Sequence, residues 1–210
     1  GIEYNSMDDD RERGKEALDV ILGLWQAEDG HFGYEGKYYQ VHAPEIEPEL
    51  GRRLYLKPYQ QPHPPIGVAA SSPDSDTIRM AGEKGWIPIT NLMAHHVQDL
   101  WKKFEEGAAS TGQHTDRSDL RLGREIYVAA TRELAREEAL IVLGRPFNEH
   151  QWLNRKAGGN LAQVKLDPNM ADEAVDVDYM MENVWIVGDP EECADKLRRL
   201  HHDVGGFGSL

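Results

Sequence analysis

Two adjacent serines, Ser71 and Ser72, stand between a short apolar run and a segment of helix-forming composition. The run, Ile66 to Ala70, has the length and composition of a strand buried on both faces, which favours a parallel sheet. Serine hydroxyls beside the unpaired N–H groups at the start of a helix suit a phosphate group. The alternative is that Ser72 only caps the helix, while Asp74 and Asp76 complement the dipole and would repel an anion.

The segment around these serines predicts one β-α-β unit. Ser72 is the candidate N-cap, Pro73 occupies the first helical position, and the helix runs from Asp74 to about Lys84. Gly85 is expected to end the helix in a left-handed conformation. Trp86 to Thr90 then begins the next strand, which completes the unit in fewer than about thirty residues.

Other residues that could bind a metal or take part in catalysis lack the partners that this chemistry needs. The pairs His95-His96 and His201-His202 have no carboxylate at matched spacing, so no metal site is expected. Cys193 lies in the first turn of a helix without a base at a matched position, and packing is the expected role. The sequence has no Gly-x-Ser-x-Gly elbow, phosphate-loop lysine motif or Gly-x-Gly-x-x-Gly after a strand, which disfavours hydrolases, nucleotidases and dinucleotide-binding folds.

Composition sets the broad class. A chain of 210 residues is enough for one domain with a substantial core, and we expect a single domain over residues 1–210. The 23 Lys and Arg against 37 Asp and Glu give a formal net charge of −14, which disfavours a nucleic-acid partner. Apolar stretches are short and Cys193 is the sole cysteine, so the sequence predicts a cytoplasmic protein without a membrane segment.

The remaining periodicities place the serines within a series of strand-helix units. The expected elements are a helix through Leu18 and Trp25, a hairpin within Asp29–Val41, an extended connection over Ala43–Pro65, a helix over His95–Gly107, a turn-rich stretch over Ala108–Leu122, a strand over Arg124–Thr131, a helix from Arg132 to about Leu143 with Thr131 as its cap, a strand over Val184–Gly188 and a helix over Glu191–His202. Asp189, Pro190 and Glu192 form the capping box of that last helix. The order of elements predicts an α/β fold, either a barrel or an open doubly wound sheet.

Pro146 to Asn183 does not fit this repeating pattern, and such long connections are usually functional or mobile. One interpretation is a lid over a substrate pocket, in which Trp152, Leu153, Met180 and Met181 supply an apolar inner surface and Gly158-Gly159 acts as a hinge. The other is an acidic, partly disordered insertion with its apolar residues packed on the outer helices.

Four stretches, taken in order, resemble the bacterial luciferase-like flavin-dependent monooxygenases. PPIGVAASSPDSDTIRMAGEKG resembles the fifth strand and following helix of that family. EALDVILGLW and FGYEGKYYQV resemble the segment before that strand, and VGDPEECADKLRRLHHDVGGFGSL resembles the closing helix with its entry to the eighth strand. The resemblance implies a (β/α)₈ TIM-barrel type fold, here an incomplete barrel lacking the N-terminal strands.

The same resemblance implies a flavin-dependent monooxygenase that uses reduced FMN, supplied by a separate flavin reductase, and O₂ to oxygenate a small organic substrate. The residues that match the family's phosphate-contact turn are Ala70, Ser71 and Ser72, with Ser75 and Thr77 as further candidates. The family's active-site histidine belongs to the strands that precede this sequence, so no residue is assigned as catalytic and the fragment alone is expected to be inactive. A homodimer is expected of the full-length protein.

Two other functions remain open at this point. A relative within the family would transfer hydride with a reduced deazaflavin and no oxygen, and the absorbance of the bound cofactor would separate it from an FMN enzyme. A non-catalytic flavin-binding protein could use the same fold, because fold alone does not settle function.

Overall fold

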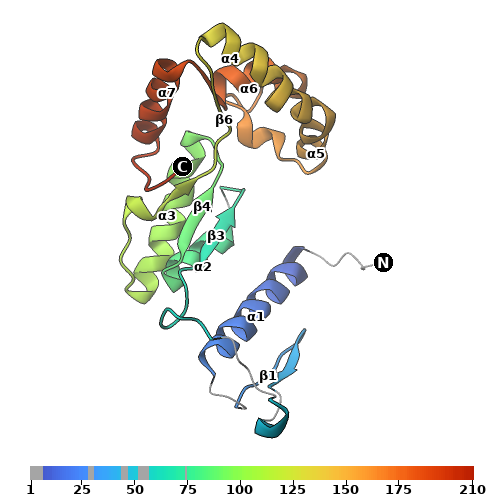
Figure 1. Cartoon of the computed structure of the whole chain (residues 1–210), viewed down its shortest axis with the longest axis vertical. Coiled ribbons are helices and arrows are strands. Elements are labelled where there is room, and N and C mark those ends of the chain that lie inside the picture. Colours follow the sequence, from blue (N-terminus) through green and yellow to red (C-terminus); the bar gives the residue numbers. More distant parts are fainter. Residues whose placement is uncertain (1–6, 28–30, 44–46, 52–56, 74) are drawn as a thin grey trace. The chain divides into compact units, whose positions relative to one another are not determined.

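The computed structural model describes the chain except for residues 1–6, 28–30, 44–46, 52–56 and 74. The chain folds into two compact units, Gly1–Pro65 and Ile66–Leu210 (Figure 1). The single domain expected over residues 1–210 stays a prediction.

The first unit consists of a helix and the expected hairpin. Its elements are α1 (Met7–Gln26), β1 (Gly33–Glu35), β2 (Gln40–His42) and a 3₁₀ turn at Pro48–Leu50. The two strands pair antiparallel, as predicted, although residues 29 and 30 of the expected hairpin lie outside the described residues. The buried carboxylate of Glu16 on α1 accepts hydrogen bonds from the backbone N–H groups of Tyr38 (2.9 Å) and Tyr39 (2.7 Å), which fastens the hairpin turn to the helix.

The second unit contains the parallel sheet. Strands β3 (Gly67–Ala70), β4 (Ile87–Thr90) and β5 (Arg121–Leu122) pair in that order, and a further parallel bridge joins Arg121 to Ser209. The helices α2 (Asp76–Lys84) and α3 (Ala94–Thr111) follow β3 and β4. The barrel-like order of strand, helix, strand and helix is confirmed.

The prediction that the first strand is buried on both faces is wrong. Ala70 and Thr90 are buried, whereas the alternate positions Gly67, Ala69 and Ile89 are exposed. Successive side chains of a strand point to opposite faces, so this pattern means that one face is covered and the other is bare among the described residues. The buried apolar side chains of α2 and α3 supply the cover on the first face.

The start of α2 also differs from the prediction. The N-cap is Ser75, not Ser72, and its side chain makes no capping hydrogen bond. The Ser75 N–H donates to the Ser72 carbonyl over 3.2 Å, so the chain completes a turn before the helix begins. The predicted first residue, Asp74, lies outside the described residues. The end of the helix is as expected, with Gly85 in the left-handed region at φ 65°.

Helices α2 and α3 approach each other closely at two glycines. A Cβ on Gly107 would lie 2.1 Å from the carbonyl oxygen of Arg79, and a Cβ on Gly82 would lie 2.1 Å from the carbonyl oxygen of Phe104. The sequence predicted that α3 ends near Gly107, but the helix continues to Thr111 and Gly112 ends it with φ 72°. Gly107 serves the helix contact rather than the helix end.

A second, two-stranded parallel sheet joins β6 (Ile126–Val128) to β7 (Ile186–Gly188). It confirms the core of the predicted strand over Arg124–Thr131, but β5 lies in the stretch that was predicted to be only turns. The short strand was missed because its pairing partner is β4, about thirty residues away in sequence, and not a local pattern.

The helix after β6 is much longer than predicted. It begins at Arg132, where the Thr131 side chain accepts from the Leu134 N–H over 3.2 Å as expected, and it runs through Gly144 and Pro146 to Ala157. This helical run comprises α4 (Arg132–Ala139), π-helical turns at Leu140–Gly144 and Phe147–Gln151, and α5 (Trp152–Ala157).

The wider π turns flank Pro146, which cannot donate an i−4 hydrogen bond. Gly144 was expected to end the helix, but a Cβ there would lie 2.9 Å from Val177 Cγ1, so the glycine allows close packing instead.

Helical turns make up much of the segment Pro146–Asn183, and its buried side chains share one core with residues of α4 and β7. The segment ends with α6 (Val177–Asn183), and Phe147 meets Trp185 edge-on at a centroid distance of 5.6 Å. Met180 and Met181 are each 1% exposed within this core, so the prediction that they line a pocket is wrong. Leu153 is 58% exposed. Met180 and Met181 belong to one buried cluster with Ala135 and Ala139 of α4 and Val187 of β7.

The closing helix α7 (Pro190–Asp203) begins as predicted, with the Asp189 carboxylate accepting from the Glu192 N–H over 2.9 Å. The Glu192 side chain binds Lys196 over 3.1 Å. Cys193 on this helix is buried, and burial raises the pKa of its thiol, which supports the packing role.

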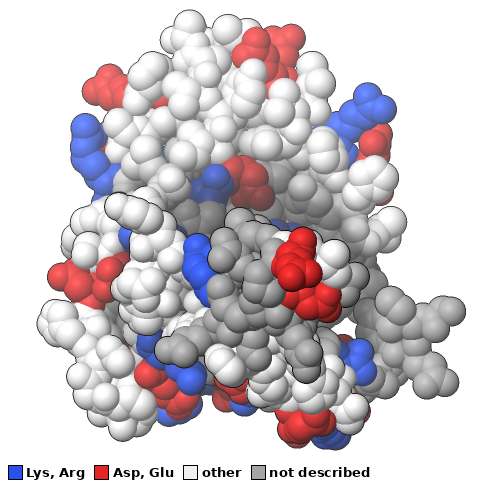
Figure 2. All heavy atoms as spheres, turned by 60° about the horizontal axis from the view of Figure 1, so that its bottom comes forward, with Lys and Arg blue, Asp and Glu red and all other residues white. Residues whose placement is uncertain are grey.

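Two surface properties bear on possible partners. Within the described ranges, no helix is both long and apolar enough to cross a membrane. Lys and Arg side chains are interspersed with Asp and Glu on the face shown in Figure 2, although the formal net charge of the chain is −14.

Candidate functional site

Polar side chains gather where the parallel strands end. Ser71 follows β3, Asn91 follows β4, and Glu125 lies between β5 and β6. These three residues line one cavity of about 390 Å³. The long helix and the loop after it supply the rest of the lining, namely Gln151, Asn154, Arg155, Asn160 and Gln163. The carboxyl ends of parallel strands are where α/β folds place their ligands.

A second cavity, of about 400 Å³, lies beside Ser72 and Pro73. His95 and His96 from the start of α3 line it, together with residues of the loop that follows α5. Gln163 lines both cavities, so the two adjacent serines border neighbouring spaces that share one wall.

The predicted phosphate-contact residues therefore differ in whether they line a cavity. Ser71 and Ser72 border the cavities, whereas Ala70 is buried beneath them. The carbonyl oxygen of Ala70 accepts a hydrogen bond from Thr90 Oγ1 over 2.8 Å. Ser75 and Thr77, at the start of α2, are not among the lining residues of these two cavities. The assignment of these five residues to a cofactor stays a prediction.

Of the residues that line this cavity, sequence reasoning named only Ser71, and Arg155 is the charged donor that it missed. Its guanidinium is half-buried, lines the cavity beside Ser71, and has no ion pair within the described part of the chain. Gln151, Asn154 and Arg155 follow the i, i+3, i+4 spacing of one helix face, and this was the available signal. It was overlooked because no local pattern shows that this face of the helix lies over the strand ends.

The basic residues that line the second cavity are Lys165, His95 and His96, and the lysine is bound by the protein itself. The Lys165 ammonium donates to the Met170 carbonyl (2.6 Å) and to the Asp172 carboxylate (2.8 Å). The His95 and His96 rings lie 4.0 Å apart, and burial, assisted by the neighbouring His95, lowers the pKa of His96. Among the described residues, no group of three or more His, Cys, Asp or Glu is placed to hold a metal ion.

Parallel strands with polar residues collected at their carboxyl ends are the arrangement in which α/β barrels and doubly wound sheets bind ligands. The model of the luciferase-like monooxygenases matches residues 1–206, and the chain belongs to this family. The resemblance that the sequence carried is confirmed.

The relatives show how far the likeness extends. The chain is 27% identical over 214 residues to the 3,6-diketocamphane 1,6-monooxygenase of Pseudomonas putida, with 93% of this chain and 53% of the relative covered. It is 33% identical over 167 residues to the limonene 1,2-monooxygenase of Rhodococcus erythropolis, with 75% and 39% covered. The chain thus spans about half the length of the curated relatives it matches.

A solved structure confirms the fold. The oxygenating constituent of 3,6-diketocamphane monooxygenase from Pseudomonas putida, determined in complex with FMN, superimposes with a TM-score of 0.82 at 24% identity. The match covers 95% of this chain and 55% of that structure. The luciferase-like α/β barrel type is therefore the fold class of this protein.

Proposed function

We propose that the chain is the carboxyl-terminal part of a flavin-dependent monooxygenase that uses reduced FMN and O₂ to oxygenate a small organic substrate. The observation that carries this proposal is the cavity at the strand ends, where Ser71 and Arg155 stand together in a chain related to named monooxygenases.

The chemistry of the donors fits the phosphate end of FMN. The hydroxyls of Ser71 and Ser72 and the guanidinium of Arg155 are donors, and the N–H groups at the start of α2 add a positive dipole end. The backbone of Ala70 and the side chains of Ser75 and Thr77 belong to the same proposed turn. Glu125 carries the wrong charge for phosphate, and its carboxylate suits hydroxyl groups such as those of a ribityl chain.

The bare face of the sheet supports the proposal of an incomplete barrel. Ile89 is 37% exposed, and Gly67 and Ala69 on the same face are also exposed. In a complete (β/α)₈ barrel this face is the interior, where side chains from all strands pack in layers. In this proposal residues 1–210 form one part of that barrel, and the segment at 146–183 is an excursion from it.

The protein's own residues bind and orient the cofactor and keep water from the reacting centre. When bound, reduced FMN supplies the two electrons that allow one atom of O₂ to enter the substrate while the other leaves as water. The names of the relatives point to cyclic, largely apolar substrates, a diketone in one case and limonene in another. For a cyclic ketone the balanced reaction is ketone + O₂ + FMNH₂ → lactone + FMN + H₂O.

Because FMN leaves oxidised, the proposal requires a flavin reductase as partner. A cytoplasmic location and a homodimer of the complete protein are parts of the same proposal.

The test uses the complete barrel protein with FMN, NADH, a flavin reductase and ¹⁸O₂, and a bicyclic diketone as substrate. We expect a lactone that carries one ¹⁸O atom by mass spectrometry, formed only when reductase and O₂ are both present. Turnover under argon with a reduced deazaflavin, and none with FMN and O₂, would replace the monooxygenase with the hydride-transfer alternative. Flavin binding without turnover of any candidate would leave the non-catalytic alternative.

A further inference from the structure

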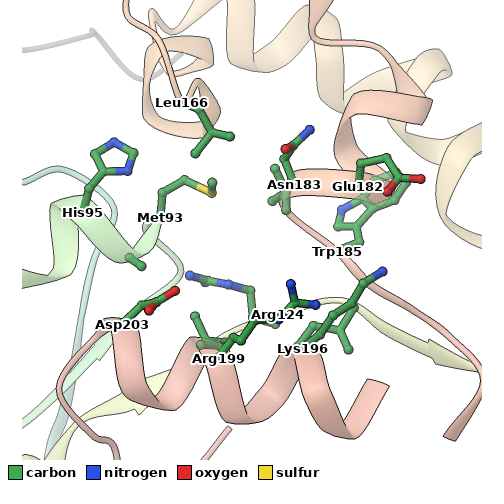
Figure 3. A pocket seen from close by; sticks show the side chains of 14 residues that line it. Met93, His95, Arg124, Leu166, Glu182, Asn183, Trp185, Lys196, Arg199 and Asp203 are labelled. Atoms are coloured by element: carbon green, nitrogen blue, oxygen red, sulfur yellow. The ribbon is translucent and has the colours of Figure 1, made fainter. Parts of the chain in front are cut away.

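A third cavity, of about 260 Å³, lies between the start of α3, the segment that joins α6 to β7, and α7, with Arg124 from the loop after β5 also in its lining (Figure 3). Its lining is mixed. Met93, Leu166 and Leu200 provide apolar surface, and Arg124, Trp185 and Arg199 provide hydrogen-bond donors. No step of the proposed monooxygenase function uses this cavity.

The indole N–H of Trp185 is the most unusual group in its wall. Trp185 is 3% exposed, and its Nε1 is buried without a hydrogen-bond partner among the described residues. Figure 3 shows this nitrogen on the edge of the ring that is turned towards the cavity. A buried donor without an acceptor is costly and rare in native proteins, so the position calls for an acceptor supplied from outside the chain.

The charges around the cavity favour an anion as that acceptor. Arg124 donates to the carbonyl oxygens of Gly123 (2.6 Å) and Leu92, which are neutral, and it makes no ion pair among the described residues, although the nearby Glu125 carboxylate acts on it electrostatically. Arg199, at the mouth, has no ion pair in the part of the chain that the structure describes. A guanidinium offers five N–H donors in a planar fork that matches a carboxylate.

The other charged groups in the lining are already bound. Lys196 pairs with Glu192 and donates to the Val187 carbonyl. The Glu182 carboxylate is held by Arg136. Asp203 lies 3.2 Å from the ring of His202. Arg124 and Arg199 are therefore the cations of the lining that have no ion pair among the described residues, and Asp203 is the acid of the lining whose partner is a histidine.

We propose that this cavity binds a small organic carboxylate with an apolar body. The carboxylate accepts from the Trp185 N–H and the guanidinium groups of Arg124 and Arg199, and the apolar body lies against Met93 and Leu166. His95 and Leu166 also line the cavity beside Ser72, so the carboxylate site is one side chain away from the proposed flavin site.

The first experiment compares three probes on the wild-type complete barrel protein labelled with ¹⁵N-tryptophan. Benzoate is the carboxylate, benzamide is its neutral isostere, and inorganic phosphate is an anion without an apolar body. We expect benzoate to shift the indole N–H resonance of Trp185 in a saturable way and to bind at least about tenfold more tightly than either control, because hydrogen bonds to a charged group are the stronger ones. Trp185→Phe identifies the resonance of this indole among those of the other tryptophans.

The second experiment uses neighbouring arginines on α7. Arg199→Gln should weaken benzoate binding by about tenfold or more, whereas Arg198→Gln should not, because Arg198 pairs with Asp195 and does not line the cavity. An unmoved Trp185 resonance, equal binding of benzoate and benzamide, or equal losses in the two variants would overturn the proposal. If phosphate bound as tightly as benzoate, the part of the proposal that assigns an apolar body to the ligand would be wrong. The wild-type probe comparison decides the matter even where a variant fails to fold.

Discussion

The hydroxyl of Thr90 donates a hydrogen bond to the carbonyl oxygen of Ala70 over 2.8 Å and accepts one from the Leu92 N–H over 3.2 Å. One buried side chain at the end of β4 thus satisfies a backbone group at the end of β3 and another in the loop after β4. The contact holds the ends of β3 and β4 together directly before Ser71 and Asn91. Both of these residues line the proposed flavin cavity.

Thr90→Val keeps the shape of this side chain and removes its hydrogen bonds. We expect a loss of about 1–3 kcal/mol in the free energy of unfolding, because the Ala70 carbonyl and the Leu92 N–H lose their Thr90 partner in a buried setting. Urea denaturation followed by circular dichroism measures it. Thr115→Val, at a half-buried loop position, is the control and should stay within about 0.5 kcal/mol of the parent. Equal effects of the two changes would remove the strand-end role of Thr90.

Gly107→Ala tests the close contact between α2 and α3. The new Cβ would lie 2.1 Å from the Arg79 carbonyl oxygen, so the helices must separate, and we expect destabilisation of about 1–3 kcal/mol. Gly14→Ala on α1 is the matched control, since nothing lies within 4 Å of its Cβ and helix propensity alone should stabilise by about 0.5–1 kcal/mol. Thermal denaturation of both variants should therefore give shifts of opposite sign, and two shifts of the same sign would contradict the contact.

The acid stability of the loop after α5 should depend on Asp172. Hydrogen bonding to Lys165 lowers the pKa of Asp172 below its ordinary value of 3.8. The stabilising contribution is thus complete above pH 3.8 and is lost as the pH falls through the folded-state pKa. Hydrogen exchange of the amides in residues 165–172 measures this opening.

Asp172→Asn should lower the hydrogen-exchange protection of these amides at neutral pH. That protection should then no longer fall as the pH is lowered. Asp195→Asn is the control, because its carboxylate pairs with the exposed Arg198 and leaves the Lys165–Asp172 contact in place. The same acid dependence in Asp172→Asn and in the parent would rule out this carboxylate as its source.

The sequence predicted the elements whose signals are local. Asp189, Thr131 and Gly85 each stand where the structure places a cap, because a cap depends on a few neighbouring residues. The β-α-β unit and the family resemblance followed from the same short range of sequence. The sequence also pointed to Ser71 and Ser72, which the structure places at cavities.

The errors concern residues whose role depends on distant neighbours. Gly107 and Gly144 resemble helix ends in sequence, but their partners are Arg79 on α2 and Val177 on α6. Met180 and Met181 were predicted to line a pocket, yet they are buried in a core cluster that includes residues of α4 and β7. Arg155 was missed for the same reason, because only tertiary packing brings the long helix over the strand ends.

Ser72→Ala can now be interpreted more simply than the sequence allowed. Because Ser75 and not Ser72 is the N-cap of α2, removal of the Ser72 hydroxyl should not cost a helix cap. We expect the complete barrel protein to lose about 1–2 kcal/mol of FMN affinity, measured by isothermal titration calorimetry, through the loss of a hydrogen bond to a charged group. Riboflavin, which has no phosphate, is the control ligand. Equal losses for both ligands would leave Ser72 with a structural role only.

Arg155→Gln provides the most direct test of the proposed flavin site. The change keeps a polar side chain beside Ser71 and removes the positive charge. Arg145→Gln, on the same long helix, removes an exposed arginine that pairs with Glu149 and serves as the matched control. The measurement is the ratio of FMN to riboflavin dissociation constants in the complete barrel protein. We predict that Arg155→Gln reduces the preference for FMN by at least about tenfold while riboflavin affinity and the Arg145→Gln ratio stay unchanged. An unchanged ratio in Arg155→Gln would show that the flavin phosphate does not bind at this cavity.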